Sequence, residues 1–162
     1  HSAGARVILD AAQAAPHDRL NIAESGADMV AVSAHKMCGP TGIGALMVNA
    51  ETFAEMQPFI GGGDMIREVT KDGITYNDAP MKFEAGTPGI VATIGLGVAL
   101  DFMMDLGMEN IAAHEDDLRD YAVSRLSGLN WLNLQGTTPD KAAIFSFTLD
   151  GAAHAVAGVH VS

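Results

Sequence analysis

Residues that could do covalent chemistry gather in a short segment between two apolar runs. Ser33, His35 and Lys36 follow the apolar residues 30–32, and a loop with glycines and a proline leads into the second run at 43–48. A lysine amine can form an imine with a carbonyl compound, and hydroxyl and imidazole groups can bind an anion. We therefore interpret Lys36 as a residue that carries a cofactor as a Schiff base.

Two residues earlier in the chain extend this set. Asp10 ends a β-branched and aliphatic run, and Gln13 follows three residues later. Pyridoxal phosphate could use such residues, because it needs a lysine, a carboxylate that keeps its ring nitrogen protonated, and donors for its phosphate and phenolate oxygens. Each residue also has an ordinary interpretation: Lys36 as a solvated loop lysine, Asp10 as a turn former, and His35 and Ser33 as local loop residues. Residue types and spacing leave both interpretations open.

Other kinds of site have less support. Cys38 lies three residues after His35, but no second ligand pair follows, so we predict no metal site. Cys38 is better interpreted as a small turn residue than as a nucleophile, since nothing else marks an activated thiol. The glycines at 61–63 resemble a phosphate-binding loop but match neither G-x-G-x-x-G nor the Walker pattern.

Composition limits the partners and the setting. The chain has 162 residues, 48% of them hydrophobic, and carries 9 Lys+Arg against 20 Asp+Glu for a net charge of −11. An acidic chain without basic runs disfavours nucleic acid and anionic membrane surfaces as partners. A single cysteine excludes an intrachain disulfide, and neither a signal peptide nor a run of ~20 apolar residues is present. These features predict a cytoplasmic protein.

The first half of the chain is predicted to be α/β. Strands are expected at 6–9, 27–32 and 43–48, with short helices at 21–25 and 51–56. The connection between the last two strands is too short for a helical crossover, so they should be antiparallel neighbours. The first strand should be buried, and because few residues precede it we expect a later part of a longer protein.

The second half begins with a long segment, 61–89, that is predicted to be irregular and to need a partner subunit for support. Thr87 should cap a helix that has Pro88 at its first position and continues through 89–106. This helix is apolar enough to be buried. An amphipathic helix should follow at 108–127, with Glu115 placed to pair with Arg119. Strands are expected at 131–134 and 143–149, and residues 151–162 show no closing strand.

Four motifs resemble those of one family, in order and spacing. They are D-A-A-Q-A-A-P-H at 10–17, S-A-H-K-M-C-G-P-T-G-I-G at 33–44, G-G-G-D-M-I at 61–66 and K-F-E-A-G-T-P at 82–88. Together they resemble the cysteine desulfurases of the class V aminotransferase group, in particular the branch that supplies sulfur for iron–sulfur cluster assembly and overlaps with selenocysteine lyases. The likeness continues through G-M-E-N-I-A-A-H-E at 107–115 to about residue 150.

The resemblance implies a fold and a domain organisation. The fold would be the α/β type I fold of PLP-dependent transferases. Residues 1–95 would be the C-terminal part of the PLP-binding large domain, and residues 96–162 would be a linking helix with a truncated small α+β domain. The chain would then cover less than half of the family's usual length.

The resemblance also implies roles for six residues. Lys36 would form the Schiff base with pyridoxal 5'-phosphate, Asp10 would pair with the ring nitrogen, Gln13 would contact the ring hydroxyl, Ser33 and His35 would bind the phosphate, and Thr87 would reach the phosphate of the neighbouring subunit's cofactor.

The sequence also departs from the family pattern. Cys38 stands where the family has a bulky residue and is not its sulfur-accepting cysteine, and Lys82 stands where arginine is common. The family's upstream phosphate-binding turn, ring-stacking histidine, substrate-binding arginine and sulfur-accepting cysteine have no counterpart here.

By resemblance, the function is that of a PLP-dependent cysteine desulfurase. Such an enzyme takes sulfur or selenium from L-cysteine or selenocysteine, leaves alanine, acts as a homodimer and passes sulfur to an acceptor protein. We expect these 162 residues to be inactive alone. One alternative is another class V enzyme, an aminotransferase, lyase or epimerase. A second is a non-catalytic fragment that binds no cofactor.

Overall fold

The computed structural model describes residues 1–139, 141–151 and 156–160, the last of these as backbone only. The described residues form two compact units, one made of 1–16 with 20–105 and the other of 17–19 with the residues from Leu106 onward. The contacts divide the chain after Asp105 and also assign three residues of the early crossover to the second unit. The domain organisation that the resemblance implies, with a boundary after residue 95, stays a prediction.

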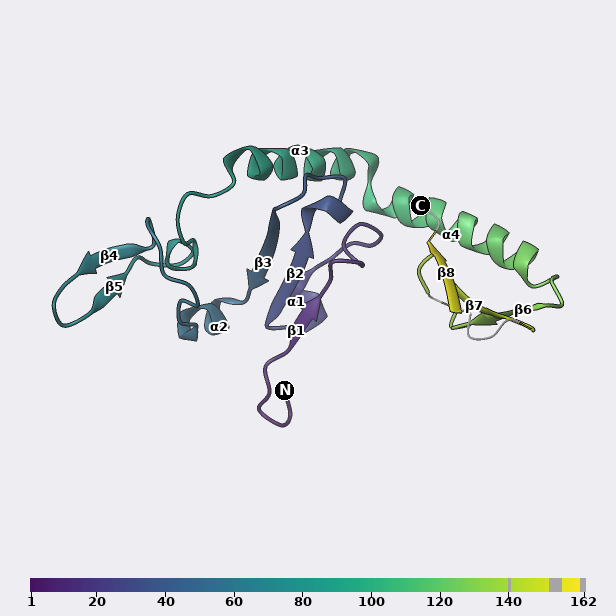
Figure 1. Cartoon of the computed structure of the whole chain (residues 1–162), viewed down its shortest axis with the longest axis horizontal. Helices are drawn as coiled ribbons and strands as arrows, with labels where there is room; N and C mark the ends of the chain where they lie inside the picture. The colour runs from purple at the N-terminus through teal and green to yellow at the C-terminus, as the bar shows by residue number, and fades with distance from the viewer. Residues whose placement is uncertain (140, 152–155, 161–162) are drawn as a thin grey trace. The chain divides into compact units, whose positions relative to one another are not determined.

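The first unit is built on a three-stranded sheet in the order β1-β2-β3, which Figure 1 shows. β1 (Ile8–Asp10) runs parallel to β2 (Met29–Ser33), and β3 (Gly44–Val48) runs antiparallel to β2. The predicted antiparallel pairing is therefore confirmed. The crossover between β1 and β2 holds only the short helix α1 (Ile22–Ser25).

Burial in this unit is limited. Ala11, Ala27 and Val30 form the buried cluster, and Leu20, Ile22 and Val32 pack against it. The prediction of a buried first strand is wrong for this chain, because Ile8 on β1 is 63% exposed. β1 pairs with β2 on one side only, and no other described strand lies along its second edge.

A buried carboxylate fastens the start of β2 to its neighbours. Asp28 is 5% exposed and accepts hydrogen bonds from the Val7 amide at 2.7 Å and from Asn49 Nδ2 at 3.1 Å. Arg6 Nη1 lies 3.5 Å from Asp28 Oδ1, the oxygen that also accepts from Asn49. These contacts tie the chain before β1 and the residue after β3 to one point.

Short elements follow the sheet. α2 (Ala50–Glu55) begins at Asn49, whose side-chain oxygen accepts from the Thr52 amide. The segment predicted to be irregular instead contains a hairpin, β4 (Ile66–Val69) and β5 (Ile74–Tyr76), followed by the 3-10 turn η2 (Met81–Phe83). That prediction is wrong because the two strands are too short to show a clear period, and only their pairing makes them regular.

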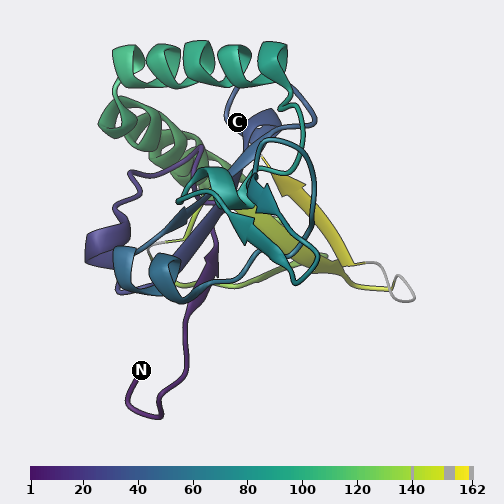
Figure 2. The same cartoon turned by 90° about the vertical axis from the view of Figure 1, so that its left-hand side faces the viewer.

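The long helix α3 (Ile90–Leu106) passes over the end of the sheet in both Figure 1 and Figure 2. It starts later than predicted, since the Thr93 amide bonds to the Gly89 carbonyl and Pro88 lies before the first turn. The predicted burial is also wrong: only Ala99 and Met103 are buried. Exposed apolar side chains on it are Ile90, Val91, Ile94, Val98, Leu100, Phe102, Met104 and Leu106. No single helix of the described residues is long and apolar enough to cross a membrane.

The second unit pairs a helix with a sheet. α4 (Met108–Leu126) precedes the antiparallel strands β6 (Leu132–Gln135), β7 (Ile144–Leu149) and β8 (Val156–His160), in that order across the sheet. Phe145 on β7 is 1% exposed and forms part of the core. The expectation that residues 151–162 contain no closing strand is wrong, because β8 lies among them. Residues 152–155, 161 and 162 of that range lie outside the described part.

The predicted pairing of Glu115 with Arg119 on α4 is also wrong. Arg119 pairs with Asp116 and Asp120, and the hydrogen bond that Arg119 Nε donates to Asp120 Oδ1 is the main reason that the pKa of Arg119 is raised. Glu115 instead bonds to His17, a residue 98 positions earlier in the chain.

Candidate functional site

The carboxyl ends of β1 and β2 lie at the same edge of the sheet, because the two strands are parallel. Asp10 is opposite Ala31, and the Ala11 amide continues the pairing by donating to the Ala31 carbonyl at 2.9 Å. Ser33, the last residue of β2, is two positions beyond Ala31. Open α/β sheets bind ligands at the carboxyl ends of their strands. Asp10 and Ser33 lie at this edge, and both are accessible to solvent.

A tight turn follows Asp10. Asp10 Oδ1 accepts from the Ala12 amide at 3.0 Å, and the Ala11 carbonyl accepts from the amides of Ala14 and Ala15. Ala11 is fully buried and anchors the turn, whereas Gln13 is exposed at its surface. Within the described residues, Asp10 Oδ2 and the Gln13 side chain make no hydrogen bond, so both can meet a ligand.

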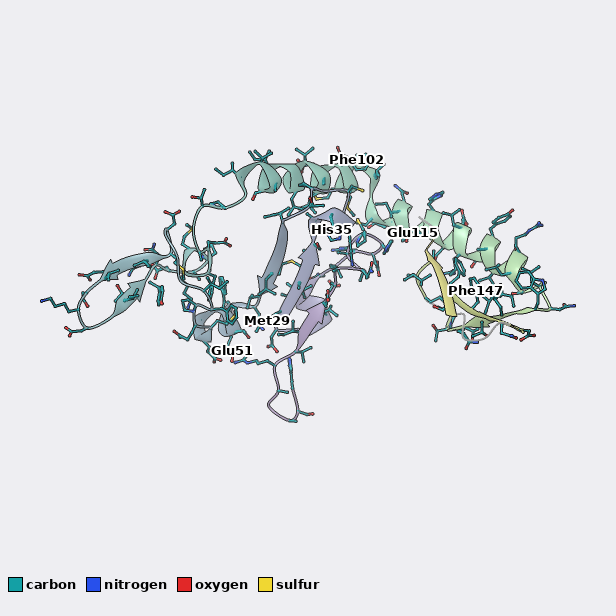
Figure 3. The ribbon with its side chains drawn as sticks, in the orientation of Figure 1. Met29, His35, Glu51, Phe102, Glu115 and Phe147 are labelled. Atoms are coloured by element: carbon teal, nitrogen blue, oxygen red, sulfur yellow. The ribbon has the colours of Figure 1, made fainter. Side chains whose placement is uncertain are left out.

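The lysine lies in a second turn at the same edge. The 3-10 turn η1 (Ala34–Lys36) directly follows β2, and Figure 3 labels His35 there. Ser33 Oγ and His35 Nδ1 are 2.9 Å apart, which leaves the imidazole Nε2 for another partner. Lys36 is half-buried, and its amine has no hydrogen bond or ion pair with any described residue.

Backbone packing holds this turn in place. Ala34 is fully buried, its amide donates to the Ile43 carbonyl at 3.1 Å, and its carbonyl accepts from the Gly39 amide at 2.9 Å. A Cβ at Gly39 would lie 2.9 Å from the Ala34 carbonyl oxygen, and one at Gly44 would lie 2.6 Å from the Val32 carbonyl oxygen. Because real side chains do not approach so closely, both positions require glycine.

α3 supports the same turn from outside the sheet. A Cβ at Gly95 would lie 3.0 Å from Pro40 Cγ, so this helix packs directly on the loop after Lys36. The turn is therefore held by β3 on one side and by α3 on another.

Thr87 is placed differently from the other five predicted residues. It is exposed, and no hydrogen bond of the described residues joins it to the two turns at the sheet edge. Its own motif packs on the glycine motif: the Gly86 amide donates to the Gly63 carbonyl at 2.9 Å, and a Cβ at Gly62 would lie 3.1 Å from Ala85. The two glycine-containing motifs thus form one local structure.

Lys82 and Cys38, the two departures from the family pattern, have separate surroundings. Lys82 donates to the Met56 carbonyl at 2.9 Å, lies over the Phe83 ring and lines an open pocket of about 450 Å³ between α2 and the segment after β5. Cys38 is exposed with a φ of 57°. Among the described residues no group of three or more His, Cys, Asp or Glu side chains could hold a metal ion.

The structure thus brings Asp10, Ser33 and the lysine turn to one sheet edge, with Gln13 on the adjoining turn and Thr87 apart. Their roles stay predictions. Sequence reasoning gave no role to His17, although it ends the motif that contains Asp10 and Gln13. It also gave none to Asp28, whose only signal was a lone charge beside an apolar run.

The chain matches a known protein family over nearly its whole length. The family model described as "Aminotransferase class-V" matches residues 1–160. The chain belongs to the class-V aminotransferase family. A curated relative from Streptomyces coelicolor, named a probable cysteine desulfurase, is 48% identical over 148 residues, which are 90% of this chain and 35% of the relative.

Solved structures of other proteins are also similar to this chain. The cysteine desulfurase CsdA from Escherichia coli is similar with a TM-score of 0.86 and 35% identity, over 95% of this chain and 38% of its own. The cystine C-S lyase C-DES, solved with its product cysteine persulfide, gives 0.78 and 26%, over 90% of this chain and 39% of its own. A C-DES mutant with lysine replaced by alanine, matching equally well, holds glycine covalently linked to the PLP-cofactor.

These likenesses confirm the α/β prediction and the type I fold of PLP-dependent transferases, of which this chain is a part. The chain spans between 35% and 39% of the length of these family members.

Proposed function

We propose that Lys36 binds pyridoxal 5'-phosphate as a Schiff base and that these residues form part of a cysteine desulfurase active site. One observation carries the proposal: a lysine that has no partner among the described residues follows β2 at the sheet edge that also bears Asp10. Membership of the class-V family and the PLP-linked C-DES structure supply the identity of the cofactor.

The residues at the edge fit this cofactor in chemical type. Lys36 offers an amine that no described residue occupies, and Asp10 keeps one carboxylate oxygen available after its bond to Ala12. Ser33 and His35 already contact each other, and their remaining hydrogen-bonding positions suit a phosphate group.

Each residue has a distinct task in this proposal. The bound cofactor supplies an electron sink for reactions of amino acids. Asp10 would keep the ring nitrogen of the cofactor protonated, and Gln13 would bind the hydroxyl group of the ring. Lys36 Nζ in its neutral form can accept and return a proton. Ser33 and His35 bind the phosphate, and Thr87 serves the cofactor of a neighbouring subunit.

The proposed reaction removes sulfur from L-cysteine, or selenium from selenocysteine, and leaves alanine. The 48% identity to a relative named a probable cysteine desulfurase supports this substrate class. We further propose a cytoplasmic homodimer that passes sulfur to an acceptor protein for iron–sulfur cluster assembly. The exposed apolar side chains of α3 support a partner subunit.

A second candidate is a lyase acting on cystine. The likeness to C-DES, a cystine C-S lyase, favours it, but at 26% identity against 35% for the desulfurase CsdA. The two can be separated in a longer protein that contains these residues. With cystine, a lyase gives cysteine persulfide, whereas a desulfurase given cysteine produces alanine.

Cofactor binding can be tested on the 162-residue chain directly. After unbound pyridoxal phosphate has been removed, we expect the chain to keep a visible absorbance band that Lys36→Ala abolishes. Lys71→Ala is the matched control, because Lys71 is an exposed lysine in the β4–β5 hairpin. If the original chain gives no band, or if Lys36→Ala keeps it, the assignment of Lys36 is wrong, and a missing band favours a fragment that binds no cofactor.

Turnover is expected to fail in the same sample. The chain spans little more than a third of the desulfurases it resembles, so we expect no sulfide or alanine from cysteine even with cofactor bound. Sulfide and alanine released above the level of the Lys36→Ala variant would contradict this expectation.

A further inference from the structure

We propose that His17 and Glu115 are a positioning pair, which holds the turn bearing Asp10 and Gln13 in its shape. The consequence for the cofactor rests on the proposed function, but the effect on the turn does not. Neither residue touches the atoms of the proposed chemistry in this role; each acts through the turn that follows β1.

The pair is close and sheltered from water. His17 Nδ1 and Glu115 Oε1 are 2.7 Å apart, and each side chain is 13% exposed. Figure 3 labels Glu115 on α4. An ionised carboxylate can only accept, so His17 must carry a proton on Nδ1. Hydrogen bonds with one charged partner are among the stronger ones in proteins.

The chain between the turn and the pair has little freedom. The Ala11 carbonyl binds the amides of both Ala14 and Ala15, and Pro16, whose ring restricts its backbone, directly precedes His17. Residues 17–19 belong to the second unit, while the turn itself belongs to the first. A displacement of His17 is therefore passed within a few bonds to the hydrogen bonds that shape the turn.

Amide hydrogen exchange, measured by NMR, tests the effect on the turn without cofactor. In Glu115→Ala we expect the Ala14 and Ala15 amides to exchange about ten- to a hundredfold faster, because a charge-assisted hydrogen bond that restrains local opening is lost. The Asn49 amide, which donates to the Asp28 carbonyl near the opposite end of β2, should be unchanged and reports on global stability.

Two further variants separate the pair from other effects of mutation. Asp117→Ala removes an exposed acid from the same helix and should leave Ala14 and Ala15 unchanged. Glu115→Gln keeps an oxygen that can accept from Nδ1 and should restore most of the protection. Unchanged exchange in Glu115→Ala would overturn the proposal, and so would an equal acceleration of the Asn49 amide. If Glu115→Ala does not fold, the comparison is between Glu115→Gln and His17→Ala. Protection of Ala14 and Ala15 that is no better in Glu115→Gln than in His17→Ala would then overturn the proposal.

A spectroscopic measurement links the pair to the cofactor. If the chain binds pyridoxal phosphate, Glu115→Ala should weaken binding about tenfold and leave the visible band present, while Lys36→Ala removes it. An absent band in the original chain would contradict the proposed function alone, since the exchange experiment decides the positioning role by itself. Unchanged affinity alongside faster exchange would overturn the link to the cofactor.

Discussion

Asp28 and Lys36 lie beyond the two ends of β2 and have opposite surroundings. Asp28 is buried and meets an amide, a carboxamide and a guanidinium, whereas Lys36 has no partner among the described residues. A fully partnered buried charge contributes to holding the sheet together, and an unpartnered lysine at a sheet edge is available for chemistry.

The partners of Asp28 predict a dependence of stability on pH. The Val7 amide is the largest cause of the lowered pKa of Asp28; burial opposes it, and Asn49 and Arg6 lower the pKa further. Because the folded-state pKa lies below the ordinary value of 3.8, this stabilisation is present above that pH and is lost as the pH falls through the folded-state value.

Thermal unfolding of Asp28→Asn and the original chain across acid pH checks this expectation. The variant should melt several degrees lower at neutral pH, and the difference should shrink below about pH 3.8. Asp101→Asn, which changes an exposed aspartate on α3, should show no such difference. A gap in melting temperature that stays constant down to the lowest pH would show that Asp28 does not act through its charge.

At the residue scale, the candidate site could be predicted from the sequence, but the contacts that support it could not. Asp10 and Lys36 stand out because each follows an apolar run, which predicts the end of a strand. His17 and Glu115 meet across 98 positions, so no local pattern could join them. The expected pairing of Glu115 with Arg119 failed because Asp116 and Asp120 are nearer competitors for the same guanidinium.

At the scale of elements, the turn between β2 and β3 depends on glycine at the start of β3. We expect Gly44→Ala to destabilise the chain by about 1–3 kcal/mol, because its Cβ would meet the Val32 carbonyl oxygen at 2.6 Å and force the strands apart. Gly97→Ala is the matched control. Gly97 lies inside α3 with nothing within 4 Å of an added Cβ, so the same substitution should stabilise by about 0.5–1 kcal/mol.

Denaturant unfolding measures both changes on one scale. Equal effects of the two substitutions, or a neutral Gly44→Ala, would contradict the role of Gly44 in strand pairing.

The long elements were predictable and the short ones were not. α3 and α4 have enough residues for their composition and period to indicate helices, and their limits lie within a few residues of the prediction. β4, β5 and β8 have three to five residues each. Strands this short show no clear period of their own, and it is the pairing of β4 with β5 and of β8 with β7 that makes them regular.

At the scale of the whole molecule, burial was overestimated for β1 and α3. Apolar composition predicts that a surface is covered in the working protein, but the cover need not come from the same 162 residues. Val91 is 85% exposed and Ile94 is 64% exposed in a chain that spans 38% of the length of CsdA. Exposed apolar surfaces of this kind are expected to be covered by other protein segments or subunits.

Self-association follows from that exposure. We expect sedimentation of the 162-residue chain to show larger species as concentration rises, and Val91→Glu to favour the monomer by placing a charge in the contact. Tyr121→Glu alters an exposed side chain on α4 and should have a smaller effect. A monomer at every concentration would count against the homodimer.

The assignment of residues 17–19 to the second unit also bears on how that unit could be prepared in isolation. A recombinant product starting at Leu106 would keep Glu115 but lose His17, so a half-buried carboxylate would enter solution without its imidazole partner. Fusing a short peptide with the sequence 14–20 ahead of α4, or adding this peptide separately, should give a C-terminal product that is more stable to unfolding than the simple truncation.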